Sequence, residues 1–95
     1  MAVEVRIPTI LRKHTGGAKA VGSKGSTIRA VIDQLDADHP GLRAAILADG
    51  GEIHRFINIY LNDEDVRFVG ALDTPVEDGD VVSILPAVAG GAARG

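Results

Sequence analysis

Cysteine and tryptophan are absent from this chain of 95 residues, and aromatic residues account for only 3% of it. The lack of cysteine excludes disulfide bonds, thiolate metal sites and cysteine nucleophiles. Because aromatic rings are scarce, the core must be built from aliphatic side chains, and a hydrophobic content of 45% is ordinary for a globular protein. A chain of this length fits one compact domain.

Positive charge is also in short supply. The chain has 10 Lys and Arg against 13 Asp and Glu, which gives a net charge of −3 and a pI near 5.5. A general nucleic-acid binder needs excess positive charge to displace counterions from phosphates, so we expect no nucleic-acid partner. Residues 1–6 alternate between apolar and charged side chains, a pattern typical neither of a signal peptide nor of a membrane span. We therefore expect a cytoplasmic protein with no membrane partner.

Negative charge is concentrated in the second half of the chain, in the runs 63–65 and 77–80. Charges in such runs usually do no more than solvate loops. The other interpretation is that these acidic runs steer a basic partner toward this half of the protein.

No arrangement of residues predicts a catalytic site or a metal centre. The three histidines, His14, His39 and His54, lack the spacing of metal ligands. The glycine-rich stretch 17–24 lacks the Gly-Lys-Ser/Thr of a phosphate-binding loop, and there is no Gly-x-Ser-x-Gly motif. We expect a protein that is not an enzyme, with no catalytic residue, no metal site and no bound cofactor.

The first half of the chain predicts a hairpin and then a helix. Apolar and charged residues alternate over 3–7, as in a strand buried on one face, and 19–21 can form the second arm of a hairpin. Ser26 or Thr27 can cap the following helix. The buried stripe of that helix has the expected spacing and consists of Ile28, Val31, Ile32 and Leu35. A short second helical segment can follow at 42–47.

The second half of the chain predicts three strands. The longest covers 53–61, and a turn at 62–65 leads to a short return strand at 66–69. The run 81–85 is almost continuously apolar, which predicts a central strand shielded on both faces.

These elements predict a two-layer α+β domain over residues 1–87. A mixed sheet of four or five strands packs against one main helix, and the first and last strands lie side by side in its middle. That arrangement is a ubiquitin-like β-grasp. We expect a monomer when the protein is alone, with residues 88–95 as a flexible C-terminal tail.

The segment 78–91, DGDVVSILPAVAGG, resembles the C-terminal signature of the ThiS/MoaD-type ubiquitin-like sulfur carriers. In that family a Gly-Asp turn leads into the last strand, and a short extended tail ends in Gly-Gly. The segments 7–12 and 55–67 are similar to those of the CysO branch, which serves cysteine biosynthesis.

This resemblance implies that Gly91 is the reactive residue. An E1-like adenylyltransferase/sulfurtransferase would use ATP to adenylate its carboxylate, and sulfur would then replace AMP to leave a thiocarboxylate. Val88, Ala89 and Gly90 would thread the tail into the partner, since glycine allows close backbone approach. The acceptor would be a biosynthetic enzyme, either cysteine synthase-like or thiosugar synthase-like.

The chain departs from the family pattern because residues 92–95 follow Gly91. The resemblance implies a precursor that is cut between Gly91 and Ala92, by a JAMM-type zinc metalloprotease such as those that accompany the CysO branch. A cloning remnant is the alternative explanation for this extension.

Phe56, Asn58 and Tyr60 alternate with the aliphatic residues of the longest predicted strand. If the aliphatic residues face the helix, these three side chains form a partner-docking patch beside the tail. The alternative is that Phe56 and Tyr60 fill corners of the core.

Other functions stay open at this point. The chain could be the small subunit of molybdopterin synthase or a thiamin sulfur carrier, both of which use the same terminal chemistry. From a different class, it could be a ubiquitin-like interaction module that binds without covalent chemistry.

Overall fold

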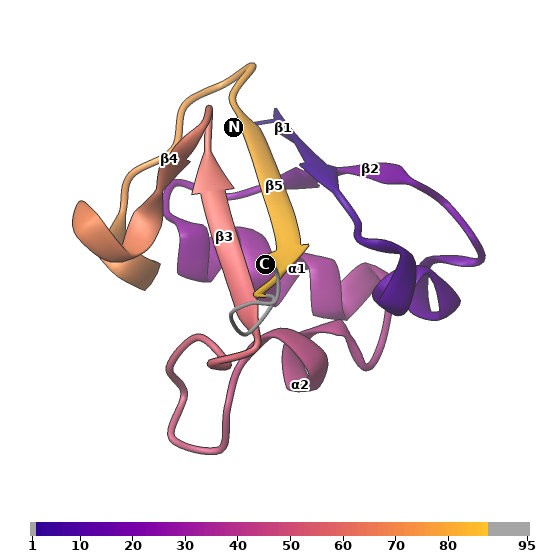
Figure 1. Cartoon of the computed structure of the whole chain (residues 1–95). Helices are drawn as coiled ribbons and strands as arrows, with labels where there is room; N and C mark the ends of the chain where they lie inside the picture. Colours follow the sequence, from indigo (N-terminus) through magenta and orange to yellow (C-terminus); the bar gives the residue numbers. More distant parts are fainter. Residues whose placement is uncertain (1, 88–95) are drawn as a thin grey trace.

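The computed structural model describes residues 2–87, which form one mixed sheet with helices on one side (Figure 1). The sheet has five strands in the order β2-β1-β5-β3-β4. The strands are β1 (Ala2–Arg6), β2 (Ala20–Lys24), β3 (Ile57–Leu61), β4 (Glu64–Asp65) and β5 (Val81–Pro86). The α-helices are α1 (Ile28–Asp38) and α2 (Leu42–Ile46), and the 3-10 helices are η1 (Thr9–Thr15), η2 (Val66–Phe68) and η3 (Ala71–Asp73).

The pairing of the strands confirms the predicted β-grasp arrangement. β1 and β5 run parallel at the centre of the sheet, with Val5 opposite Val82. The outer pairs β1–β2, β3–β5 and β3–β4 are antiparallel. The first and last strands are therefore neighbours, and the chain leaves the middle of the sheet where β5 ends.

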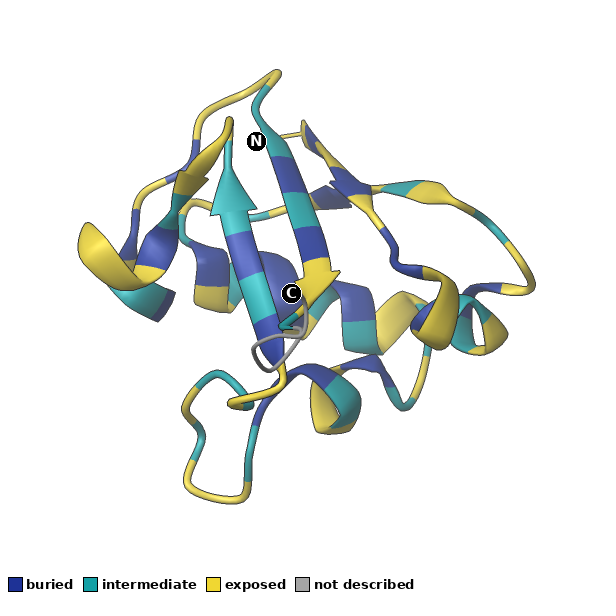
Figure 2. Ribbon diagram, viewed as in Figure 1, coloured by how far each residue is buried: buried dark blue, intermediate teal, exposed yellow. Residues whose placement is uncertain are grey.

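The core lies between α1 and the inner face of the sheet. In Figure 2, buried residues alternate with less buried ones along β3 and β5, as expected of strands that bury one face. The core is aliphatic, as the composition predicts, and its most deeply buried members include Val5, Ile32, Leu35, Ile59 and Ile84. Burying each such side chain contributes roughly 1.5–3 kcal/mol.

Thr27 decides where α1 begins. Its side-chain oxygen accepts a hydrogen bond from the Ala30 N–H at 3.2 Å, so Thr27 rather than Ser26 is the cap. The helix ends at Asp38, His39 is its C-cap before Pro40, and α2 follows within a few residues.

The predicted strand over 53–61 is shorter in the structure and begins only at Ile57. Ile53 instead forms an isolated bridge with Leu47. Between them the chain turns at His54, whose ring Nδ1 accepts the Phe56 N–H and whose carbonyl accepts the Ile57 N–H. A local side-chain hydrogen bond thus competes with strand pairing and delays the start of β3.

The predicted return strand at 66–69 is wrong, because the strand that returns after the turn is β4 and is only two residues long. The turn itself is at Asn62 and Asp63, both with positive φ, as a two-residue hairpin turn requires. The Asp65 carboxylate then accepts the Arg67 N–H at 2.9 Å and caps η2, which turns Val66 into the core.

The expectation that β5 is shielded on both faces is also wrong. β5 is central, but only Val82 and Ile84 are buried, whereas the Leu85 residue is 46% exposed. Packing in the core therefore does not account for the apolar residues on the other face of β5.

The connection between β1 and β2 contains a 3-10 helix that the sequence pattern did not indicate. η1 is anchored by the burial of Leu11 and by a hydrogen bond from Arg12 Nε to the Ile7 carbonyl at 3.1 Å. Within residues 2–87, no helix combines the length and apolar character that crossing a membrane requires.

Candidate functional site

The residues predicted to carry the chemistry lie outside the described part of the chain. These are Gly91, the threading residues Val88, Ala89 and Gly90, and Ala92 on the far side of the expected cut. The structure instead describes the place from which this segment starts, at Ala87 directly after β5.

The start of the tail is held by the sheet. Pro86 lies opposite Ile57 at the end of the β3–β5 pairing, and the Ala87 N–H donates to the Phe56 carbonyl at 2.7 Å. Backbone pairing therefore continues to the last described residue. On its other side β5 is paired with β1. The sheet therefore fixes the position from which the tail starts.

The outer face of the sheet carries exposed apolar side chains next to this point. Phe56 is 51% exposed and Leu85 is 46% exposed. Asn58 lies opposite Leu85, and Tyr60 lies opposite Ser83, on the face away from the buried Ile57 and Ile59. The exposure of Phe56 excludes a core role for its ring. The docking role of Phe56, Asn58 and Tyr60 stays a prediction.

Leu85 belongs with this outer face, although the sequence pattern placed it in the core. The sequence did indicate this outward position, because Leu85 alternates in phase with Ser83 and out of phase with the buried Val82 and Ile84. An apolar residue at this outward position adds little to the core, and exposed apolar patches are typical of interaction surfaces.

Two arginines near the start of β3 were not singled out by the sequence pattern. The Arg55 guanidinium lies 5.1 Å from the centre of the Phe56 ring, a cation–π arrangement. Arg67, from η2, donates to the Ile57 carbonyl and to the Asn58 side chain. Only the tertiary structure brings Arg67 to this strand.

The two acidic runs meet at the opposite end of the sheet. Asn62 Nδ2 donates to Asp80 Oδ1 at 3.0 Å, which joins the β3–β4 turn to the loop before β5. This hydrogen bond, together with that from the Glu77 N–H, holds the pKa of Asp80 below the usual value of an aspartate. The acidic runs are thus away from the start of the tail, at the top of Figure 1.

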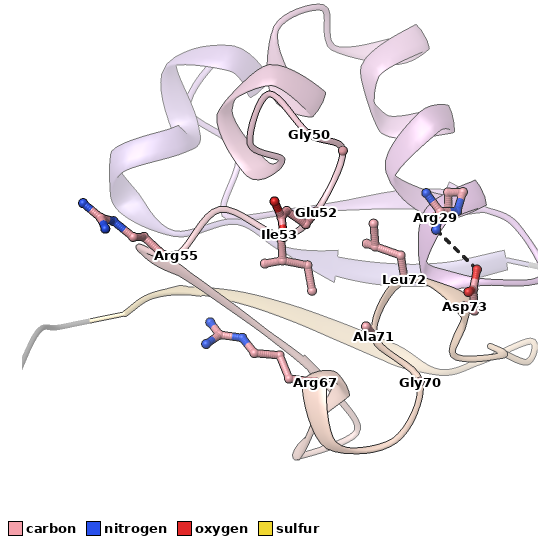
Figure 3. A pocket seen from close by; sticks show the side chains of 11 residues that line it. Arg29, Gly50, Glu52, Ile53, Arg55, Arg67, Gly70, Ala71, Leu72 and Asp73 are labelled. Carbon is pink, nitrogen blue, oxygen red and sulfur yellow. Dashed lines mark hydrogen bonds and ion pairs between the residues drawn. The ribbon is translucent and has the colours of Figure 1, made fainter.

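A hollow of about 650 Å³ lies between η3, the start of α1 and the loop that follows α2. At one end of it Arg29 and Asp73 form an ion pair at 3.4 Å, while Arg55 and Arg67 lie toward the end of β5 (Figure 3). Its described lining includes no serine, threonine, histidine or lysine. Among residues 2–87 no group of three or more metal-binding side chains is found. The charged side chains of its described lining are three arginines and two carboxylates, Glu52 and Asp73.

The chain is similar in sequence to a known protein family and to characterised members of it. The model of the ThiS family matches residues 5–91. The chain is 56% identical to the sulfur carrier protein CysO of Mycobacterium tuberculosis over 93 residues, which cover 96% of this chain and all of that protein.

Solved structures of CysO proteins are also similar to this chain. The crystal structure of Mycobacterium tuberculosis CysO is 55% identical, with a TM-score of 0.88 over 90% of this chain and 99% of that one. A chain in the crystal structure of the Amycolatopsis orientalis BexX/CysO complex is 56% identical, with a TM-score of 0.87 over 94% of this chain and 99% of that one.

Proposed function

Because the chain belongs to the ThiS family, we propose that it is a sulfur carrier protein of the CysO type, whose residue Gly91 carries sulfur as a terminal thiocarboxylate. The observation that carries the proposal is the extent of the family match, which runs through the last strand and stops at Gly91. The supporting geometry is a tail that starts from the centre of a sheet, beside an exposed apolar face.

The chemistry requires activation by another protein. A C-terminal carboxylate, with a pKa of about 3.3–3.7, is ionised at neutral pH and is a poor electrophile. An oxygen of the Gly91 carboxylate attacks the α-phosphorus of ATP, and pyrophosphate leaves. Sulfide-level sulfur (HS⁻) then attacks the carbonyl of the acyl adenylate and loses its proton, and AMP leaves with the bridging oxygen. The product is a thiocarboxylate at Gly91.

In this proposal the protein is a co-substrate and the E1-like adenylyltransferase/sulfurtransferase is the enzyme. ATP binds to that partner, and the carrier binds no cofactor of its own. Because activation uses ATP, we place the protein in the cytoplasm.

The outer face beside the tail is the proposed docking surface for such partners. Phe56, Leu85 and Tyr60 supply apolar and aromatic area, and aromatic residues are frequent anchors of interfaces. Four residues in a fully extended chain span at most about 14 Å. The carbonyl of Gly91 therefore reaches no further than this from Ala87, so the partner must hold its nucleotide within that distance of the docked sheet.

The residues after Gly91 must be removed before activation. We propose a cut between Gly91 and Ala92 by a JAMM-type zinc metalloprotease, which releases residues 92–95. The support is that the family match ends at Gly91 while the chain continues to Gly95.

The acceptor of the sulfur is a biosynthetic enzyme. A cysteine synthase-like acceptor is favoured by the 56% identity with CysO. A thiosugar synthase-like acceptor is the second candidate, because a CysO relative has been crystallised as a complex with another protein, BexX. In either case the acceptor meets the same outer face and the same tail.

The proposal is tested by comparing two chains, one ending at Gly91 and one ending at Ala89. Each is incubated with ATP, a sulfur donor and the activating enzyme of the source organism, and its intact mass is measured. We expect the chain ending at Gly91 to exchange one oxygen for one sulfur and the shorter chain to stay unchanged. Equal activity of the shorter chain in sulfur delivery would instead identify a non-covalent interaction module.

A further inference from the structure

Basic side chains surround the point where the tail begins, although the protein as a whole is acidic. We call Arg6, Arg12, Lys19, Arg55 and Arg67 the basic rim. They come from both sides of β5, and they gather at the end of the sheet where β5 stops.

One side of the rim is built by β1, η1 and the start of β2. Arg6 lies opposite Ser83, and Ile7 donates its N–H to the Lys19 carbonyl at 2.8 Å. Arg12 is tied to the same place by its hydrogen bond to the Ile7 carbonyl. Arg6, Arg12 and Lys19 line one surface hollow together with Leu85. This half of the rim therefore borders the exposed apolar residue nearest the tail.

The other side of the rim is built around the start of β3. Arg55 stacks on Phe56, whose carbonyl binds the Ala87 N–H. Arg67 is held on the Ile57 carbonyl, opposite Pro86. In the close-up view both side chains lie toward the side on which β5 runs out (Figure 3). The tail thus starts between two groups of positive charge.

The positive charge of the rim is largely uncompensated within residues 2–87. Arg6 is paired with Glu4 at 3.1 Å, but Arg12, Lys19, Arg55 and Arg67 form no ion pair with a described residue. The acidic runs that give the protein its net negative charge are at the opposite end of the sheet. The molecule therefore has a basic end, from which the tail starts, and an acidic end.

We propose that the basic rim docks on a partner protein whose cleft for the tail is bordered by carboxylates and floored by apolar side chains. This inference rests on the proposed function, because it concerns the protein that receives the tail. The occupant is a protein rather than a polyanion, because the centre of the surface, Phe56 and Leu85, is apolar and exposed. A ring of charge around an apolar centre is the usual anatomy of a protein interface.

The test uses charge reversals at two ends of the same strand edge. Lys19→Glu changes the rim, whereas Lys24→Glu changes an exposed lysine opposite Ala2, at the far end of β2, by the same amount of charge. Arg55→Glu tests the other side of the rim. Each change is made in the chain ending at Gly91, and the KM of the activating enzyme for the carrier is measured at low and high salt.

We expect Lys19→Glu and Arg55→Glu to raise this KM about tenfold at low salt, since charges at the edge of an interface mainly steer association. The difference should shrink as salt screens the charges, and Lys24→Glu should change KM less than about twofold. Thermal midpoints of all three variants should stay close to that of the unmodified chain, which separates docking from folding.

Equal effects of Lys19→Glu and Lys24→Glu would overturn the basic rim while leaving the proposed function intact, provided that the unmodified chain is converted. A lower KM for the rim variants would overturn it as well, because it would indicate a basic partner. If the rim variants lost binding to anionic phospholipid vesicles and kept their KM, the rim would belong to a lipid surface. Failure of the unmodified chain to be converted would remove the proposed function and the inference together.

Discussion

The side chain of Asn62 is bonded to that of Asp80, a residue eighteen positions later in the chain. Asn62 Oδ1 also accepts the Val81 N–H at 2.9 Å, and the Asn62 N–H donates to the Val81 carbonyl at the same distance. One asparagine at a hairpin turn thus fixes the start of β5, the strand that carries the tail. The acidic runs of the sequence are therefore part of a structural connection at the end of the sheet away from the tail.

Asp80→Asn tests this connection through its pH dependence. The folded-state pKa of Asp80 lies below its usual value, so the ionised carboxylate stabilises the fold above about pH 3.9, and this contribution is lost as pH falls through the folded-state pKa. We expect the variant to have a lower thermal midpoint than the unmodified protein near neutral pH. The two midpoints should converge in acid.

The control for that experiment is Glu77→Gln. Its side chain makes no hydrogen bond or ion pair with a described residue, although its N–H binds Asp80. A constant difference between Asp80→Asn and the unmodified protein from neutral pH into acid would contradict the assigned role of the carboxylate.

Thr27→Ala should destabilise the protein by about 0.5–2 kcal/mol, because it removes the acceptor for the Ala30 N–H at the start of α1. The neighbouring change Ser26→Ala is the matched control and should have little effect. Urea denaturation of both variants measures the difference. Equal stabilities would show that Thr27 does not act as the cap.

Gly25→Ala should destabilise the protein by about 1–3 kcal/mol. Gly25 has a φ of 156°, and an added Cβ would lie 2.7 Å from the backbone nitrogen of Val31. Gly22→Ala in β2 is the control, because a Cβ there meets nothing within 4 Å. If urea denaturation gave the two alanine variants the same stability, the close approach of the β2–α1 connection to the helix would be wrong.

The fold could be predicted from the sequence wherever local periodicity and burial agree. The stripe Ile28, Val31, Ile32 and Leu35 indicated α1 because helical spacing and the core face coincide. The prediction failed where a single side chain redirects the backbone. The ring of His54 binds the Phe56 N–H and delays β3, and the Asp65 carboxylate starts η2 in place of a strand. Neither hydrogen bond leaves a periodic signal.

The candidate site was only partly predictable for a related physical reason. Strand alternation indicated an outer-face position for the aromatic residues but left open a role in corners of the core, which the exposure of Phe56 excludes for that residue. Leu85 was harder to place, because the apolar run 81–85 masks the alternation, and only its phase with Ser83 indicated the outer face. Arg67 joins the site through a contact across ten positions that depends on the β3–β4 turn.

Phe56→Ala should weaken binding to the activating enzyme while leaving stability nearly unchanged, because half of the residue is exposed beside the tail. We expect a loss of about 1–2 kcal/mol in binding, as for a typical interface anchor. Phe68→Ala is the matched control, since this residue is 84% exposed on η2 rather than on the strands. Isothermal titration measures the affinity of both variants for the activating enzyme. A loss of stability in place of binding would contradict the docking role.

The central claim is that sulfur is carried on the carbonyl of Gly91, and it is tested most directly by locating that sulfur. The chain ending at Gly91 is incubated with ATP, a sulfur donor and the activating enzyme, and its C-terminal peptide is then fragmented in a mass spectrometer. We predict one sulfur in place of one oxygen on the terminal glycine, dependent on ATP. Sulfur delivered to an acceptor while the Gly91 carboxylate keeps both of its oxygens would contradict the account.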